Sequence, residues 1–394
     1  MIRKIADGVY NVGALDWERV LFDEIVDLPQ GTSYNAYVVF GKEKIALIDT
    51  VEPEKAEQLF KNLEELGVER IDYIVSNHAE QDHSGAIPMV LEKYPEAKIV
   101  ANAKCMEFEK DLLHLKDEDF IVVKEGDTLD LGGKTLEFIM TPWVHWPETM
   151  STFLKEDAVV FTCDFFGSHA ATTHIFAEQY DRIYHEAKRY YAEIMMPFRH
   201  IIVRNIKKIE AKNPKIIAPS HGPAYSNPEF IINAYKEWIS PETKNEVLIA
   251  YVSMHGSTKK MVDYLVDSLA KRGIEVKVRD LIHSNLGEIA IDLVDVTTVI
   301  IATPTMLSGP HPSAVYLAYL VNALKPKAKL IGIIGSYGWG GRTVDILKAN
   351  LGSLKAELLE PLLIKGLPRE EDYERIDEFA GIIAEKHREL RVLK

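Results

Sequence analysis

The sequence after residue 245 alternates strand and helix signals, and this rhythm limits the possible folds more than any other feature. Continuous runs of Val, Ile and Leu occur at 247–252, 297–302 and 329–335, and stretches of helical periodicity separate them. Apolar runs without polar alternation are typical of parallel strands that are buried on both faces. We therefore predict a doubly wound α/β domain with a parallel sheet over residues 245–394.

Residues 1–244 follow a different pattern, with short β-rich stretches, turns and helical segments. The helical segments include 53–66 and a long amphipathic stretch at 182–209. The segment at 239–246, ISPETKNE, is almost free of apolar residues and marks the change of pattern. Since a domain averages about 150 residues, a chain of 394 residues has room for two or more such units. We expect sheets covered by helices over residues 1–244, followed by the parallel-sheet domain.

The charge balance and the cysteine content exclude several classes of protein. With 46 Lys and Arg against 60 Asp and Glu, the formal net charge is −14, and no basic run exceeds pairs such as Lys207-Lys208. Phosphate backbones need clustered cations, so we expect no nucleic-acid partner. The N-terminus has no apolar signal-peptide core, and no apolar run approaches the ~20 residues that cross a bilayer, so we expect a cytoplasmic protein without membrane association. Two cysteines, Cys105 and Cys163, are too few for a disulfide framework or a four-thiolate metal site.

Seven residues that can bind metal ions follow predicted strands. Four lie in the segment HAEQDHSG directly after the apolar run at 71–77, and three more end later apolar runs. Because the carboxyl ends of strands meet at one edge in layered α/β folds, we expect these side chains to converge. A lone histidine at a strand end is as often a packing residue, but packing does not account for the whole set. The seven residues are His78, Glu80, Asp82, His83, His145, Asp164 and His221.

The donor set consists of four imidazoles and three carboxylates and contains no thiolate. Seven donors exceed what one tetrahedral zinc ion needs, which predicts two metal ions about 3.5–4 Å apart that share a carboxylate. Imidazole together with carboxylate suits iron, manganese or zinc, so the residues alone leave the metal open. His169 and His174, which follow Asp164 closely, either support the ligands or belong to a polar loop.

Three loops of the C-terminal domain follow predicted parallel strands and suit a phosphate and a planar ring. The first carries hydroxyls and a glycine before a helix, where backbone N–H groups bind anions, although a helix cap explains this loop equally well by itself. The third is rich in glycine and has two aromatic residues, which are packing residues in the competing interpretation. The loop residues are Ser253, Met254, His255, Gly256, Ser257 and Thr258; Thr303, Pro304, Thr305, Met306, Leu307, Ser308 and Gly309; and Ser336, Tyr337, Gly338, Trp339, Gly340 and Gly341.

The pattern H-x-[EH]-x-D-H, followed by His, Asp and His at later strand ends, resembles the metallo-β-lactamase fold. Hydrolases of that fold usually have histidine at the third position, whereas this sequence has Glu80, as is characteristic of flavodiiron proteins (A-type flavoproteins). An anionic carboxylate in place of a neutral imidazole favours iron in its higher oxidation states. The three C-terminal loops resemble the FMN site of flavodoxin, and a GxGxxG dinucleotide fingerprint is absent.

The resemblance covers nearly the whole chain and implies an α/β architecture in two parts. Residues 1–244 would form a metallo-β-lactamase-like αβ/βα sandwich with two irons, and 245–394 a flavodoxin-like sheet with FMN. The loop at 253–258 would bind the FMN phosphate, and the other two loops would contact the isoalloxazine ring. By the same resemblance, one iron would be held by His78, Glu80, His145 and Asp164, and the other by Asp82, His83, Asp164 and His221, with Asp164 as the bridge.

A flavodiiron protein reduces dioxygen to water or nitric oxide to nitrous oxide, with electrons passed through FMN from a donor such as rubredoxin. The resemblance also implies a head-to-tail homodimer in which the FMN of one subunit faces the irons of the other. Candidate proton donors are Tyr190, Tyr191 and His169. No CxxC pair is present, so we expect a separate electron donor. Strand alternation predicts that Cys163 points away from the metals and packs in the interior.

Two other functions compete with this interpretation. The first is a dinuclear zinc hydrolase with an accessory flavodoxin-like domain, and Glu80 speaks against it. The second is an electron carrier whose first domain has lost its metal, and the complete ligand set speaks against that. Dioxygen and nitric oxide both remain candidate substrates.

Overall fold

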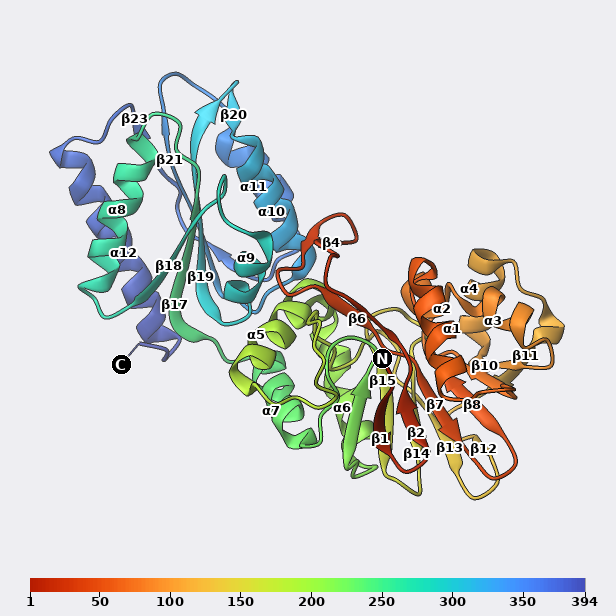
Figure 1. Cartoon of the computed structure of the whole chain (residues 1–394). Helices are drawn as coiled ribbons and strands as arrows, with labels where there is room; N and C mark the ends of the chain where they lie inside the picture. The colour runs from red at the N-terminus through yellow and green to blue at the C-terminus, as the bar shows by residue number, and fades with distance from the viewer. Residues whose placement is uncertain (394) are drawn as a thin grey trace. The chain divides into compact units, whose positions relative to one another are not determined.

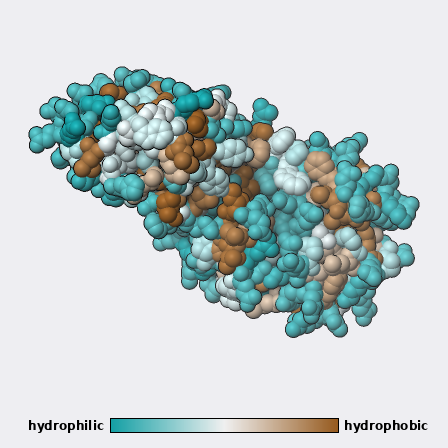
Figure 2. All heavy atoms as spheres, turned by 90° about the horizontal axis from the view of Figure 1, so that it is seen from above, coloured by the Kyte–Doolittle hydropathy of each residue, from teal (hydrophilic) through white to brown (hydrophobic). Residues whose placement is uncertain are grey.

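The computed structural model describes residues 1–393, which form two compact units. The first unit consists of Met1–Tyr191 and Phe198–Ile239, and the second of Ala192–Pro197 and the chain from Ser240 onward. No helix among the described residues is long and apolar enough to cross a membrane. On the face drawn in Figure 2 the surface is largely hydrophilic, with several apolar patches among the polar residues.

The first unit is built from two sheets with helices beside each of them (Figure 1). The larger sheet has the order β1-β2-β7-β8-β9-β10-β11, with antiparallel pairs up to β8 and parallel pairs from there on. The strands are β1 Arg3–Ala6, β2 Val9–Asn11, β7 Tyr37–Phe40, β8 Ile45–Ile48, β9 Tyr73–Val75, β10 Lys98–Asn102 and β11 Phe120–Val123. Helices of this half of the unit are α1 Ala56–Glu65, α2 Gln81–Ser84, α3 Ile87–Lys93 and α4 Ala103–Leu113.

The second sheet of this unit has the order β12-β13-β14-β15-β16 and is antiparallel except for the pair β15 and β16. Short hairpin-like pairs β3 with β6 and β4 with β5 lie outside both sheets. The strands are β12 Thr128–Asp130, β13 Thr135–Met140, β14 Met150–Leu154, β15 Val159–Cys163, β16 Ile216–Pro219, β3 Ala14–Asp16, β6 Thr32–Tyr34, β4 Leu21–Phe22 and β5 Val26–Asp27. The helices beside this sheet are α5 Tyr180–Tyr190, α6 Arg199–Glu210 and α7 Pro228–Ile239 (Figure 1).

Strand alternation explains why the strands of the larger sheet are apolar on both faces. In β8, Leu47 belongs to the core that α1, α3 and α4 cover, whereas Ile48 belongs to the core between the two sheets. Phe138 and Phe161 of the second sheet complete that inner core, and both are buried. Close packing in these two cores holds both sheets in place, and it thereby positions the strand ends that carry the candidate ligands.

The long helical stretch predicted at 182–209 is interrupted in the structure. Helix α5 ends at Tyr190, a π-helical turn spans Tyr191–Met195, a 3₁₀ turn spans Met196–Phe198, and α6 then begins at Arg199. Pro197 explains the break, because proline lacks the N–H that a helix interior needs and disfavours the helical conformation of the residue before it.

The second unit is a doubly wound parallel sheet, as the strand–helix rhythm predicts. Its strand order is β18-β17-β19-β21, and β21 also pairs with β22 and β23. Helices α8 and α12 cover one face through a core that includes Leu265 and Phe379. The strands are β17 Lys244–Tyr251, β18 Glu275–Asp280, β19 Val296–Met306, β20 Gly309–Pro310, β21 Leu330–Tyr337, β22 Glu357–Leu358 and β23 Leu362–Lys365. The helices are α8 Ser257–Ala270, α9 Leu286–Leu293, α10 Pro312–Leu324, α11 Thr343–Asn350 and α12 Glu370–Glu389.

His387 joins the last turn of α12 to the sheet and makes this unit sensitive to acid. Its Nδ1 donates to Asn245 Oδ1 at 2.8 Å, and its Nε2 accepts from the Thr298 hydroxyl at 2.8 Å. Burial lowers the pKa of His387 from 6.5 to about 4. The unfolded chain therefore binds a proton that the folded chain does not, and the free energy of unfolding should fall as the pH drops from 6.5 towards 4.

We expect this group to contribute at most about 3 kcal/mol to that pH dependence. A His387→Gln variant should be less stable at pH 7 and should show a shallower loss of stability in acid, measured by denaturant titration between pH 4 and 7. His283→Gln, at an exposed histidine of the same unit, is the control and should leave the slope unchanged. An equal slope in His387→Gln and the wild type would contradict the prediction.

Candidate functional site

The structure places all seven predicted metal-binding residues at the carboxyl ends of strands or in the segments that follow them. His78 and Glu80 lie in the loop after β9, and Asp82 and His83 lie in the short helix α2. The other three come from the second sheet: His145 from the connection between β13 and β14, Asp164 directly after β15, and His221 after β16. The side chains of His78, His83, Asp164 and His221 are almost completely buried.

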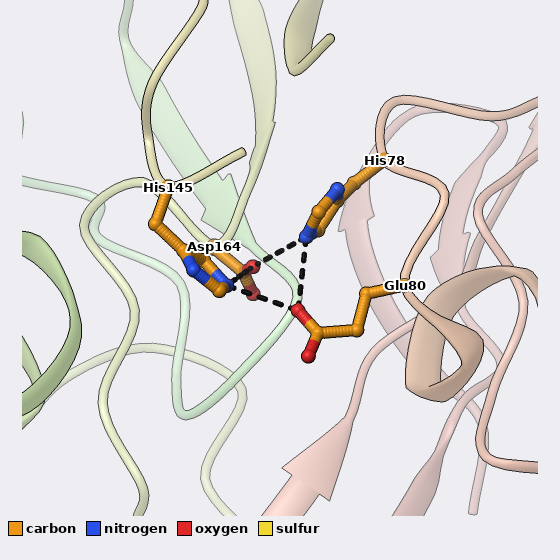
Figure 3. Close-up of side chains that lie close together, drawn as sticks. All are labelled: His78, Glu80, His145 and Asp164. Atoms are coloured by element: carbon orange, nitrogen blue, oxygen red, sulfur yellow. Dashed lines mark hydrogen bonds and ion pairs between the residues drawn. The ribbon is translucent and has the colours of Figure 1, made fainter. Parts of the chain in front are cut away.

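One group of four donors surrounds a single point, as Figure 3 shows. The ligand atoms of His78, Glu80, His145 and Asp164 lie within 4.8 Å of one another. Glu80 Oε2 is 3.1 Å from His78 Nε2 and 3.0 Å from His145 Nε2. Asp164 Oδ2 is 3.4 Å from the same two nitrogens. We call these four residues the Glu80 cluster.

A second group lies on the other side of Asp164. The ligand atoms of Asp82, His83 and His221 lie within 4.8 Å of one another. Asp82 Oδ2 is 3.0 Å from His221 Nε2, and Asp164 Oδ1 is 2.9 Å from His83 Nε2 and 3.4 Å from His221 Nε2. We call Asp82, His83 and His221 the Asp82 cluster. The two oxygens of Asp164 thus face different clusters, which is the arrangement of a bridging carboxylate.

The unpaired polar atoms of the site fit metal ions. Both carboxylate oxygens of Asp82, both ring nitrogens of His83 and Oδ1 of Asp164 are buried without a hydrogen bond of good geometry. Buried polar atoms without partners are costly, and a cation between them would satisfy them together. Burial lowers the pKa of His145, but Asp164 and Glu80 outweigh it and raise this pKa to about 9. The carboxylates therefore make the site attractive to positive charge.

Asp49 and Thr50 hold the ligand loops together, and the sequence analysis missed them. The Asp49 carboxylate accepts hydrogen bonds from the backbone N–H and the side chain of Asn77, directly before His78, at 2.8 and 2.9 Å. The N–H of Thr50 donates to the carbonyl of His83 at 2.7 Å. Both residues follow the apolar strand β8, so the signal that identified the ligands, a polar residue at a strand end, was present here too.

Two of the candidate proton donors lie beside the Asp82 cluster. The ring of His169 is 5.0 Å from that of His221 and 4.8 Å from that of Tyr190, and His169 Nδ1 is 2.9 Å from Thr32 Oγ1. Tyr191 packs instead against Trp238, with ring centroids 5.4 Å apart.

His174 belongs to the surface, because its half-exposed ring pairs with Glu178 at 3.0 Å.

The expectation that Cys163 points away from the metals is wrong. Its sulfur lies within 4.8 Å of ligand atoms of His83 and Asp164. Strand alternation fails here because Cys163 has a positive φ of 51° and the pairing of β15 with β16 shifts register after Phe161. Burial raises the pKa of the Cys163 thiol well above its ordinary value, so the group stays protonated at neutral pH.

The second unit contains a cavity of about 230 Å³ at the carboxyl ends of β17, β19 and β21. Ten of the predicted loop residues and the unpredicted Gly366, which follows β23, are among its lining residues. The full lining is Ser253, Met254, His255, Ser257, Thr258, Pro304, Thr305, Ser336, Tyr337, Gly338 and Gly366. The predicted residues outside this lining are Gly256, Thr303, Met306, Leu307, Ser308, Gly309, Trp339, Gly340 and Gly341.

The cavity suits a phosphate and an attached planar group. Helix α8 begins at Ser257, so its first backbone N–H groups open toward the loop, where an anion is stabilised. Ser253 Oγ accepts from the N–H groups of Gly256 and Lys259, both at 3.2 Å, and shapes the loop. Thr258 Oγ1 lies 3.0 Å from Ser336 Oγ and links the first loop to the third.

Gly338 lines this cavity, and no heavy atom lies within 4 Å of the position that a Cβ would occupy. A Gly338→Val variant should therefore fold normally and place its side chain in the space for the ligand. We expect FMN affinity to fall at least tenfold, which corresponds to about 1.4 kcal/mol. Fluorescence titration of the apoprotein with FMN measures this. Gly340→Val is the control, because Gly340 is equally open but outside the lining. Equal FMN affinity in the two variants would contradict the prediction.

Comparison with known proteins identifies the family. Residues 32–222 match the ODP family beta lactamase model, and residues 249–379 match the flavodoxin model. The chain is 37% identical to a nitric oxide reductase of Moorella thermoacetica, over 96% of this chain and 97% of that protein. Its fold is similar to that of rubredoxin oxygen:oxidoreductase from Desulfovibrio gigas, with a TM-score of 0.94, 30% identity and 98% of each chain covered. The flavodiiron protein from Giardia intestinalis gives a TM-score of 0.91 at 27% identity, again over 98% of each chain.

The chain belongs to the flavodiiron protein family. The predicted architecture, a metallo-β-lactamase-like unit followed by a flavodoxin-like parallel sheet, is confirmed. Its cofactors are FMN and a pair of non-haem irons. The protein is an oxidoreductase, and the competing zinc hydrolase is not favoured.

Proposed function

We propose that the protein reduces dioxygen to water, nitric oxide to nitrous oxide, or both, at its diiron centre, with electrons relayed through FMN from an external donor such as rubredoxin. The nitric oxide reductase and the rubredoxin oxygen:oxidoreductase to which the chain is similar support this reaction class. The observation that carries the proposal is Asp164, whose two oxygens face two separate donor clusters. Two redox-active ions held this close can act together on one small molecule.

We assign one iron to the Glu80 cluster, with Asp164 included, and the other to the Asp82 cluster and Asp164. When bound, two ferrous ions and reduced FMN together hold about four electrons, the number that dioxygen needs to reach water. The protein supplies anionic oxygen donors through Glu80, Asp82 and Asp164. Of these, Glu80 stands where related hydrolases usually have histidine, and this carboxylate favours iron over zinc.

Groups around the Asp82 cluster control water and protons. The ring of Phe22 lies 4.8 Å from that of His169 and 5.8 Å from that of His221, and it closes this side with apolar surface. Burial raises the pKa of Tyr190 well above its ordinary value, so its hydroxyl keeps its proton at neutral pH. We infer that Tyr190 and His169 hold protons beside the reacting molecule.

A head-to-tail homodimer is part of the proposal, because electrons must pass between FMN and the irons. Near the hairpin of β4 and β5, whose Phe22 packs on the site, Trp17 and Val20 are exposed. On the flavin loops Leu307 and Trp339 are exposed as well. In a head-to-tail dimer, Trp17 and Val20 of one subunit would face Leu307 and Trp339 of the other. This contact would bury apolar surface beside both cofactors. Sedimentation should give a dimer, and an active monomer would contradict this electron path.

Turnover measurements test the proposed reaction. The purified protein, supplied with chemically reduced rubredoxin, should consume dioxygen without releasing hydrogen peroxide, or convert nitric oxide to nitrous oxide, or do both. Stoichiometric zinc together with hydrolytic turnover, and no reduction of either gas, would contradict the proposal.

A further inference from the structure

The histidines of the two clusters differ in what holds the ring nitrogen that faces away from the metal. His78 Nδ1 donates to the carboxylate of Glu148, with 2.6 Å between Nδ1 and Oε1. His221 Nδ1 donates to the backbone carbonyl of Ser33, also at 2.6 Å. The partner is thus a carboxylate for His78 and a neutral carbonyl for His221.

Glu148 is buried and held in a fixed position. It follows His145 by three residues, and its side chain has no exposed surface. Oε1 also accepts from the N–H of Ala79 at 3.1 Å, and the backbone carbonyl of Glu148 accepts from Asn102 Nδ2 at 2.5 Å. Oε2 is buried and has no hydrogen-bond partner among the described residues. The hydrogen bonds of the carboxylate therefore go to His78 and Ala79.

A carboxylate that accepts a hydrogen bond from Nδ1 strengthens Nε2 of the same ring as a metal ligand. It keeps the proton on Nδ1, so that Nε2 presents its lone pair to the metal, and it makes the imidazole a stronger donor. A carbonyl fixes the same tautomer but adds no negative charge. Apart from the shared Asp164, two carboxylates, Glu80 and Glu148, lie within ion-pair distance of His78 in the Glu80 cluster. In the Asp82 cluster one carboxylate, Asp82, lies within that distance of His83 and His221.

We propose that Glu148 is a positioning residue that acts through His78 and makes the Glu80 cluster the tighter of the two metal positions. This inference rests on the diiron centre proposed above. It predicts that the two ions leave the protein in order, the ion of the Asp82 cluster first. It also predicts that removal of the Glu148 charge weakens one position and spares the other.

The experiment follows the release of ferrous ions from the anaerobic, iron-loaded protein to a coloured ferrous chelator. The wild type should release two ions in two phases, one ion in each. Asp82→Asn should accelerate only the fast phase. Glu148→Gln keeps the shape of the side chain and an oxygen for His78 while it removes the charge, so it should accelerate only the slow phase, by about 10- to 100-fold.

Glu109→Gln is the matched control. Glu109 is also fully buried and also has one oxygen without a partner, but its other oxygen accepts from Ser76 and not from a candidate ligand. Burial raises the pKa of Glu109 to about 8, so this substitution removes little charge at pH 7. Release from Glu109→Gln should match the wild type in both phases.

Three outcomes would contradict the proposed role of Glu148. Release of both wild-type ions in one phase, acceleration of the same phase by Asp82→Asn and Glu148→Gln, or an equal effect of Glu109→Gln would overturn the role of Glu148. If Glu148→Gln does not fold, the wild-type phases and Asp82→Asn still test the order of release. A wild type that binds fewer than two ions would overturn the diiron assignment itself, which is a different outcome.

Discussion

Asp164→Asn should produce a protein that keeps its FMN and loses both metal ions. Asp164 is the residue that faces both clusters, with Oδ1 toward His83 and Oδ2 toward His78. Asparagine offers one oxygen and a hydrogen-bond donor in place of the second oxygen, and it removes the negative charge that both ions share. Reduction of dioxygen or nitric oxide should fall at least about 1,000-fold, or about 4 kcal/mol.

Metal analysis and the visible spectrum of the purified variant measure this effect. The flavin absorbance should be retained, because the cavity of the second unit is lined by none of the residues proposed to bind metal. Asp82→Asn is the comparison, since Asp82 belongs to one cluster only and its loss should weaken one ion. An Asp164→Asn protein with one tightly bound ion, or with both, would show that Asp164 is not the bridge.

Glu80→His is expected to have the second largest effect. One oxygen of Glu80 lies 3.0–3.1 Å from the Nε2 atoms of His78 and His145, so it is the anionic donor of its cluster besides Asp164. A neutral imidazole in its place should favour zinc over iron. Because changes behind a metal ligand already cost 10- to 100-fold, replacement of the ligand itself should lower turnover by at least about 100-fold.

The measurement is metal content after growth with equal amounts of iron and zinc, combined with turnover of dioxygen and nitric oxide. Glu80→Asp, which keeps a carboxylate, should retain the preference for iron while it binds the ion more weakly. A Glu80→His protein that contains two irons and turns over at the wild-type rate would contradict the role given to this carboxylate.

The sequence was sufficient to predict that these seven side chains converge, because each follows an apolar strand and strand ends meet at one edge. His78 and His221 are 143 positions apart, yet both lie against Asp164. The supports of the site were harder to predict. Asp49 and Glu148 act through hydrogen bonds to residues distant in sequence, and those partners are known only once both sheets are in place.

The remaining errors in the sequence-based predictions arise from local features that apolar periodicity does not reveal. Alternation along β15 predicted the wrong direction for Cys163, since a positive φ and a register shift are not encoded in apolar periodicity. The pattern at 182–209 is amphipathic throughout, and the break depends on Pro197. In the second unit, β23 is a four-residue strand between Pro361 and Gly366, too short for periodicity to reveal, so Gly366 was missed at the cavity.

The central claim, two irons bridged by Asp164 and coupled to FMN, is tested most directly by counting electrons. Anaerobic reductive titration of the purified protein, with metal and flavin analysis of the same sample, should find two irons and one FMN per chain and an uptake of about four electrons. Dioxygen or nitric oxide should then reoxidise both cofactors. Two zinc ions with an uptake of about two electrons, by the flavin alone, would contradict the account.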